Sequence, residues 1–175
     1  MRIGGATLSL AKSVYRAHPT DDEIAEVLGQ RGIASMGTLN PDGSIHLAYV
    51  IFLYADGKFL VETSSVTRKA RNVEERGQAT IMVDGRTTGG RNVMVSAEGT
   101  ARILHDTEAR AANARVLAKY LRPDALEGID RAFSRFDDVT VEITPGRWRS
   151  WTNVRLRQEA EAEIGAGRYG EVWLD

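Results

Sequence analysis

The spacing of apolar residues predicts a helix near the start of the chain. In residues 19–32, PTDDEIAEVLGQRG, apolar side chains recur at helical intervals, among them Val27 and Leu28. Thr20, with Glu23 three residues later, has the pattern of a capping box, in which each residue accepts a hydrogen bond from the other's backbone N–H. We therefore expect the helix to begin just after Thr20.

Three apolar segments follow, separated by turn sequences. Residues 33–39 and 44–54 flank NPDG, and ADG precedes residues 58–63, which is typical of tight turns between antiparallel strands. The middle segment is apolar on both faces, with Leu47 on one face and Val50 on the other. A strand with one face in water alternates more cleanly. We expect both faces to be covered, one by a barrel interior and one by another element or subunit.

The rest of the pattern predicts a mixed succession of helices and strands. In order, these are a helix at 66–76, strands at 78–84 and 92–104, helices at 105–121 and 123–136, and a strand at 139–145 that RWRSW either continues or follows. Six antiparallel strands with helices inserted or appended favour a mainly β fold, a small barrel with peripheral helices. We divide the chain into an N-terminal extension (1–18), a barrel domain (19–152) and a C-terminal tail (153–175).

Composition indicates an ordinary globular domain. The chain has 175 residues, enough for one domain with a single core, and a formal net charge of −1, which creates no overall field for nucleic acid or a membrane surface. Aromatic residues make up only 7%, which disfavours a nucleic-acid-binding barrel. No apolar run approaches the roughly 20 residues of a membrane span. The N-terminal apolar stretch is broken by Ser and Lys, so we expect a cytoplasmic protein without a signal peptide.

The absence of cysteine removes a further set of functions. Disulfides, thiolate metal sites and a cysteine nucleophile are all excluded. The histidines and carboxylates are scattered without the spacing of metal ligands, so no metal site is expected. His46 and His105 are expected to be structural or solvated, and no residue stands out as a catalytic acid or base.

The segment with the clearest chemistry is TSSVTRKARN, residues 63–72, where a strand leads into a helix. Arg68 and Lys69 lie at the start of this helix, where the backbone dipole is positive and normally favours acids, whereas Glu74 and Glu75 lie towards the negative end. An anion docked there would remove the conflict, because backbone N–H groups and cationic side chains would converge on it.

Neighbouring side chains fit the same interpretation. Thr63, Ser64 and Ser65 supply hydroxyl donors just before the helix, and Asn72 shares a helix face with Lys69. A solvated basic helix whose arginines pair with acids elsewhere remains the alternative. The pattern thus leaves two readings open, an anion site or an ordinary charged surface.

These segments resemble a known family. From about Gly32 to Leu104 the chain is similar to the pyridoxamine 5′-phosphate-oxidase-like, FMN-binding split-barrel superfamily, and more narrowly to its flavin/deazaflavin-dependent oxidoreductase branch. The residues that carry the resemblance are IASMGTLNPDGSIHLAYVIFLYADGKFLVETSSVTRKARNVEERGQATIMVD and NVMVSAEGTARIL. The resemblance implies a six-stranded antiparallel split β-barrel that forms a homodimer, with the cofactor in a groove at the subunit interface.

The resemblance also implies a set of cofactor contacts. These are Thr63, Ser64, Arg68 and Lys69 at the cofactor phosphate, Asn72 supporting them, Val50, Ile51 and Phe52 beside the ring through backbone groups, and Trp148 and Trp151 closing over the ring or the substrate. Simple core or dimer packing explains the two tryptophans equally well.

Two cofactors fit this site. FMN ends in a phosphate monoester, whereas the deazaflavin coenzyme F-420 continues through a phosphodiester into lactate and glutamates, which favours an extended basic groove. Such a groove could be formed by Arg68, Lys69, Arg71, Arg76, Arg86 and Arg91. The arginine-bearing strand of the true oxidases is not evident in LAYVIFLY, which disfavours pyridoxamine phosphate oxidation. F-420 is therefore favoured, with FMN as the alternative.

The implied activity is that of an oxidoreductase. A hydride would pass between the bound cofactor and a C=C or C=N bond of a small organic substrate, while the protein supplies orientation and a dry pocket. The alternative is a non-catalytic flavin, deazaflavin or haem binding or carrier protein of the same fold. The sequence does not name the substrate, because the pocket over the ring would be built from loops and the tail.

Overall fold

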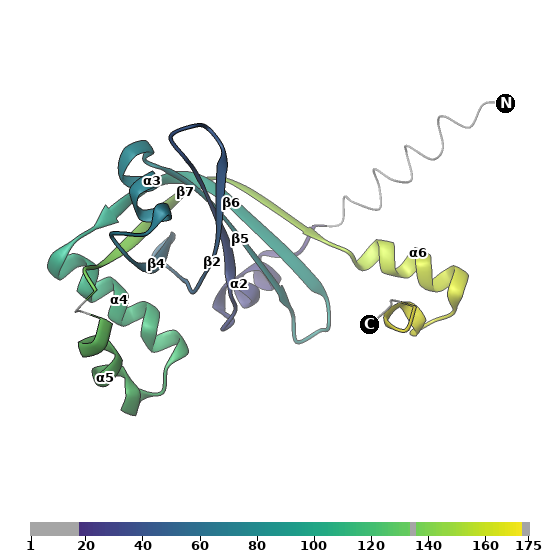
Figure 1. The fold of residues 1–175 in the computed structure, drawn as a ribbon. Helices are drawn as coiled ribbons and strands as arrows, with labels where there is room; N and C mark the ends of the chain where they lie inside the picture. Colours follow the sequence, from purple (N-terminus) through teal and green to yellow (C-terminus); the bar gives the residue numbers. More distant parts are fainter. Residues whose placement is uncertain (1–17, 134–135, 173–175) are drawn as a thin grey trace.

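A computed structural model describes residues 18–133 and 136–172, and Figure 1 shows their arrangement. The predicted N-terminal extension lies outside the described residues except for His18. No helix in the described part of the chain is long and apolar enough to cross a membrane.

The described strands form a single antiparallel sheet. They are β1 (Ala34–Leu39), β2 (Ile45–Val50), β3 (Leu53–Ala55), β4 (Lys58–Ser64), β5 (Gln78–Arg86), β6 (Asn92–Leu104) and β7 (Asp138–Thr152). Their order across the 7-stranded sheet is β2-β1-β5-β6-β7-β4-β3. The end strands β2 and β3 are not hydrogen-bonded to each other, so the sheet is not closed.

The strand count differs from the predicted six because residues 44–54 do not form one strand. The segment is interrupted at Ile51 and Phe52. The hydroxyl of Tyr120 accepts a hydrogen bond from the Phe52 N–H at 3.1 Å and lies 2.9 Å from the Phe52 carbonyl oxygen. At Phe52, the Tyr120 side chain therefore contacts the backbone groups that would otherwise be hydrogen-bonded to a neighbouring strand. The halves on either side, β2 and β3, pair with different strands at opposite edges of the sheet.

The first four helices follow the predicted order, and α6 and η1 lie in the predicted C-terminal tail. They are α2 (Asp21–Gly29), α3 (Arg68–Arg76), α4 (Asp106–Tyr120), α5 (Pro123–Phe133), α6 (Val154–Ile164) and the short 3-10 helix η1 (Arg168–Gly170). The capping box of Thr20 and Glu23 is confirmed, with both hydrogen bonds present. In Figure 1, α4 and α5 lie together beside β4, whereas α6 projects from the end of β7 away from the sheet.

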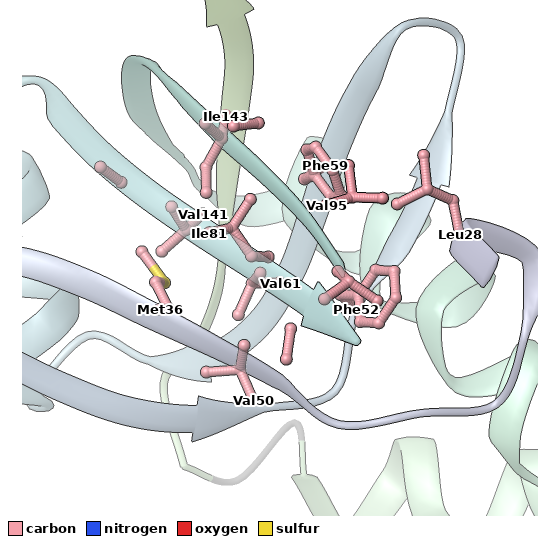
Figure 2. Close-up of a cluster of buried hydrophobic side chains, with 14 of the residues drawn as sticks. Leu28, Met36, Val50, Phe52, Phe59, Val61, Ile81, Val95, Val141 and Ile143 are labelled. Atoms are coloured by element: carbon pink, nitrogen blue, oxygen red, sulfur yellow. The ribbon is translucent and has the colours of Figure 1, made fainter. Parts of the chain in front are cut away.

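One face of the curved sheet carries the hydrophobic core. Met36, Phe52, Phe59 and Ile81 are fully buried there, and α2 contributes Leu28 to the same cluster (Figure 2). Removal of this apolar surface from water is the main force that stabilises the fold. The strand pattern did not indicate which face of β2 points inward, and the structure places the face with Val50 in the core.

The opposite face of β1, β2 and β5 is left open by the described residues. We call it the outer apolar face and define it as Leu39, Ile45, Leu47, Tyr49 and Met82. Leu47 is 69% exposed and Tyr49 is 83% exposed. A groove of about 820 Å³ runs over this face and continues across β6 to Arg147. We expected both faces of β2 to be covered. Within this chain the described residues cover only the inner face.

Candidate functional site

The predicted anion site lies where β4 ends and α3 begins. Thr63 is buried, and its hydroxyl is 3.1 Å from the hydroxyl of Thr67. Thr67 is the N-cap residue of α3: it accepts a hydrogen bond from the Ala70 N–H at 3.4 Å and donates one to the Ser64 carbonyl at 2.8 Å. The helix therefore begins at Arg68, two residues later than predicted.

The two serines before this cap are engaged within the protein. Ser64 donates from its hydroxyl to the Phe136 carbonyl at 2.7 Å, and Ser65 donates to the carboxylate of Asp137. The Ser65 N–H also donates to the Asp137 carbonyl at 3.1 Å. These bonds fix the start of β7 against the end of β4. That Ser64 contacts a phosphate stays a prediction, and it would require the hydroxyl to change partner.

Lys69 is the half-buried cation at the start of α3. Burial lowers the pKa of Lys69, and the negative charge of Glu62 partly offsets that effect. Burial also raises the pKa of Glu62, together with the charge of Asp138, while Lys69 opposes the rise. Among the described residues Lys69 forms no ion pair. A partly desolvated ammonium without a hydrogen-bonded anion is unfavourable, so this position favours the arrival of one.

Asn72 is oriented by its neighbours on β1 and the following turn. Its side chain is 1% exposed, and its amide nitrogen donates to the Thr38 hydroxyl and to the Asn40 side-chain oxygen, both at 3.0 Å. The Asn72 side-chain oxygen is buried and has no partner among the described residues. Buried acceptors are rarely left unpaired, which marks this residue as one that a bound group or an ordered water could satisfy.

Within one chain, the residues of the predicted extended basic groove do not form a continuous surface. Arg68 and Arg71 are exposed on α3, but Arg86 lies at the far end of the 9-residue strand β5, roughly 25 Å away at about 3.3 Å per residue. Arg86 donates to the Gly90 carbonyl at 3.2 Å, and Arg91 pairs with Glu23 at 3.0 Å. These two arginines hold the β5–β6 turn instead of extending the surface of α3.

Arg76, the last residue of α3, is also engaged. Its guanidinium donates to the Pro41 carbonyl at 3.0 Å. The cations at the predicted anion site are therefore Arg68, Lys69 and Arg71.

The segment predicted to run beside the cofactor ring is mostly internal. The side chains of Val50 and Phe52 are buried in the core, and Ile51 packs, half-buried, against the cluster beneath α4. The backbone groups of Phe52 are bonded to Tyr120. Ring contact by these three residues stays a prediction.

Trp148 and Trp151 lie far from α3 within one chain. Thr63 is paired with Val139 near the start of β7, whereas Trp148 lies near the other end, separated by roughly 30 Å of strand. The two tryptophans line one open cavity of about 580 Å³ with His18, Arg149 and Ser150. It stays a prediction that the two tryptophans close over a cofactor held at α3. Because of this separation, the tryptophans and the α3 helix would have to come from different chains.

His18 is the residue of this cavity that sequence reasoning missed. Its Nδ1 lies 3.0 Å from the Ser150 carbonyl oxygen. No motif surrounds His18, and Ser150 is more than a hundred residues away, so only the folded chain reveals the pair. The other histidines lie elsewhere, with His105 exposed 3.8 Å from Glu74. Among the described residues no group of histidines and acids could hold a metal ion on its own.

Solved structures share this fold. A conserved hypothetical protein from Mycobacterium tuberculosis is 25% identical, with 79% of this chain and 88% of that chain covered and a TM-score of 0.66. The haem storage protein HutZ from Vibrio cholerae is 17% identical over 75% of this chain and 94% of its own, with a TM-score of 0.60. An F420 reductase is 18% identical over 75% of this chain and 98% of its own, with a TM-score of 0.53.

Family membership follows from the sequence itself. None of the curated proteins compared with the chain matches it. The family model described as pyridoxamine 5′-phosphate oxidase matches residues 20–152, a span that contains the whole sheet and helices α2 to α5. The neighbours above have the same split-barrel arrangement. The chain belongs to the pyridoxamine 5′-phosphate oxidase family.

Proposed function

We propose that the chain binds a flavin-type cofactor, with the cofactor phosphate at the start of α3, and acts as an oxidoreductase. The observation that carries this proposal is Lys69, which is half-buried at the positive end of a helix and forms no ion pair with the described residues. The N–H groups of the first helical turn have few intrahelical partners, so a phosphate there would gain backbone and side-chain donors together.

The residues around Lys69 give the site its donor set. Arg68 adds a second cation, and the hydrogen-bonded pair of Thr63 and Thr67 places two hydroxyls beside the turn. The side-chain oxygen of Asn72 is buried and has no partner among the described residues, so it would accept a hydrogen bond from an ordered water beside the site.

For the identity of the cofactor we propose F-420, with FMN as the alternative. The segment LAYVIFLY has no arginine to clamp a phosphate monoester. Because Arg86 and Arg91 lie away from α3 within one chain, they do not support binding of the long anionic tail of F-420 beside α3. Calorimetric titration with each cofactor decides between them, and binding of neither would reject the proposal.

We further propose that a second copy of the chain covers the outer apolar face. Exposed apolar patches of this kind on a soluble protein commonly mark interfaces. The pattern of β2, apolar on both sides, fits a strand buried by the core on one face and by a partner on the other. A cofactor held between two chains would bring the tryptophans of one chain towards the α3 of the other.

The reaction proposed is hydride transfer between the cofactor and a small organic substrate. The bound cofactor supplies the hydride chemistry, and the chain binds the phosphate, orients the ring and excludes water. The test is spectroscopic: the purified protein loaded with reduced cofactor is mixed with an electron acceptor. Multiple turnovers support an oxidoreductase, whereas tight binding without turnover supports the alternative, a carrier.

A further inference from the structure

The last turn of α4 carries a lysine that contacts two other parts of the fold. Lys119 Nζ donates to the Leu28 carbonyl oxygen at 3.1 Å and lies 3.9 Å from the ring centroid of Phe52. Leu28 belongs to the last turn of α2, which has no basic residue of its own, and Phe52 lies at the break between β2 and β3. Lys119 therefore joins α4 to the C-terminal end of α2 and to the break between the two strands.

No acid balances the charge of this ammonium. Lys119 forms no ion pair with the described residues. Its contacts are the Leu28 carbonyl oxygen, the fully buried ring of Phe52 and the ring of Tyr120, whose centroid is 5.5 Å away. An ammonium taken partly out of water without a carboxylate partner is unfavourable, so this position favours the neutral amine.

The other two described lysines each have an acidic neighbour. Lys58 pairs with Glu142 at 3.0 Å, and the negative charge of Glu62 counteracts the effect of burial on the pKa of Lys69. Both neighbours stabilise the ammonium form. Among these three lysines, Lys119 is therefore the one whose surroundings least favour the charged form.

The charged side chains nearest to this contact along the two helices have other partners. On α4, Arg115 pairs with Asp56 at 2.8 Å, and on α2, Glu26 accepts a hydrogen bond from the Thr88 N–H at 2.6 Å. Burial alone lowers the pKa of Lys119 to about 8. A group with that pKa is about one-tenth neutral at pH 7, compared with roughly four parts in ten thousand for an ordinary lysine.

A neutral amine is a nucleophile, and the position of Lys119 is compatible with the product of acylation. An acylated Lys119 is uncharged, so the cost of partly burying the charge disappears, and its amide N–H can still donate to Leu28. The end of α2 would lose its only cation, and the Phe52 ring its cation–π partner. Lys119 is only half-buried, so a small acyl donor can reach its nitrogen from solvent.

We propose that Lys119 is a site of acylation by small acyl phosphates, preferred over Lys58 and Lys69, and that the modification loosens the end of α2. In the reaction the amine nitrogen attacks the acyl carbon, and the new N–C bond forms as the C–O bond to phosphate breaks. Phosphate leaves with the electron pair of that bond, and the nitrogen releases one proton to water. The proposal does not depend on a cofactor at α3, so it succeeds or fails separately from the proposed function.

The test is incubation of the full chain with acetyl phosphate at pH 7, followed by mass spectrometry of the digested protein. We expect Lys119 to be acetylated about tenfold faster than Lys58, and faster than Lys69. In urea sufficient to unfold the chain, the three rates should converge, because the preference comes from the fold. Equal rates in the folded protein, or a preference for Lys119 that persists in urea, would overturn the proposal.

The pH dependence of the two rates tests the cause of the preference. The rate at Lys119 should level off above about pH 8, where the amine is already neutral, whereas the rate at Lys58 should continue to rise. Rates that rise in parallel over this range would show that a neutral amine at Lys119 is not the reason.

Hydrogen exchange measures the effect on α2. Lys119→Gln is uncharged like the acylated residue, so backbone amides in the last turn of α2 should exchange about two- to fivefold faster than in the parent. The acetylated parent should behave in the same way. Lys119→Arg, which keeps the charge, and Arg110→Ala, which removes an exposed cation elsewhere on α4, should leave this exchange unchanged. Exchange at the parent rate in Lys119→Gln would overturn the link to α2.

Discussion

Tyr120 and Phe52 are joined by the bond that ends β2: the Tyr120 hydroxyl accepts from the Phe52 N–H at 3.1 Å and lies 2.9 Å from its carbonyl oxygen. The same hydroxyl lies 2.8 Å from the Gly32 carbonyl oxygen. One side chain of α4 thus satisfies backbone groups at the gap between two strands and ties α4 to the segment that precedes β1.

Tyr120→Phe should therefore destabilise the fold. Removing the hydroxyl leaves the Phe52 N–H and two carbonyl groups without this partner, which should cost about 1–3 kcal/mol in the free energy of unfolding. Urea denaturation measures the loss. A Tyr120→Phe variant as stable as the parent protein would contradict the role given to Tyr120.

Asn72→Asp should also reduce stability. The substitution replaces an amide nitrogen that donates to Thr38 and Asn40 with an oxygen that cannot donate, and places a charge in a buried position. We expect a loss of about 2 kcal/mol or more at neutral pH. Asn92→Asp, at an exposed position on β6, is the control in the same denaturation experiment. If Asn72→Asp unfolded at the same urea concentration as this control, the hydrogen bonds from the Asn72 amide to Thr38 and Asn40 would not contribute to stability.

Glu142 gives a prediction about acid stability. Burial opposes ionisation of Glu142, but hydrogen bonds from Arg102 at 2.8 Å and Lys58 at 3.0 Å outweigh it and lower the pKa of this carboxyl. A lowered folded-state pKa stabilises the protein above the ordinary value, and the stabilisation is lost as pH falls through the folded-state value.

Glu142→Gln should then be less stable than the parent at pH 7 by about 1 kcal/mol, a modest figure because both partners are partly exposed. The difference should shrink as pH falls from about 5 to 3. Thermal unfolding of both proteins across this range measures it. A difference that stays constant with pH would show that the carboxylate charge is not the cause.

The outer apolar face gives a prediction about assembly. Leu47 is 69% exposed near the centre of this face, so Leu47→Glu should place a charge in the proposed subunit interface and yield monomers in sedimentation velocity. Val172→Glu is the matched control, since Val172 is 48% exposed but lies after η1, outside the outer apolar face and away from the start of α3. A parent protein that is monomeric at the outset would remove the basis of the proposed interface.

The local elements of this fold were predictable because their signals are local. The capping box of Thr20 and Glu23, the turn at NPDG and the strand-to-helix change before Arg68 all depend on residues a few positions apart. The break at Phe52 could not be predicted, because Tyr120 lies in another helix. The sequence did not indicate where the side chains of Arg86 and Arg91 point. The structure places both arginines at the β5–β6 turn, away from α3.

The candidate site was predictable only in part for the same reason. Lys69 and Asn72 share one helix face, which spacing alone reveals. The engagement of Ser64 with Phe136 and of His18 with Ser150 requires the chain to return from far along the sequence. Neither contact has a local signature, so the cavity beside Trp148 emerged only from the folded chain.

The central claim is that an anionic group of the cofactor docks at Lys69. Isothermal titration of the parent and of Lys69→Ala, with F-420 and FMN in parallel, tests it most directly, with Arg110→Ala, an exposed cation on α4, as control. The account predicts that Lys69→Ala weakens binding of the preferred cofactor by about 2 kcal/mol, through loss of a charge-assisted contact, while the stability of the empty protein stays equal or rises slightly. Equal affinity of parent and Lys69→Ala for that cofactor would contradict it.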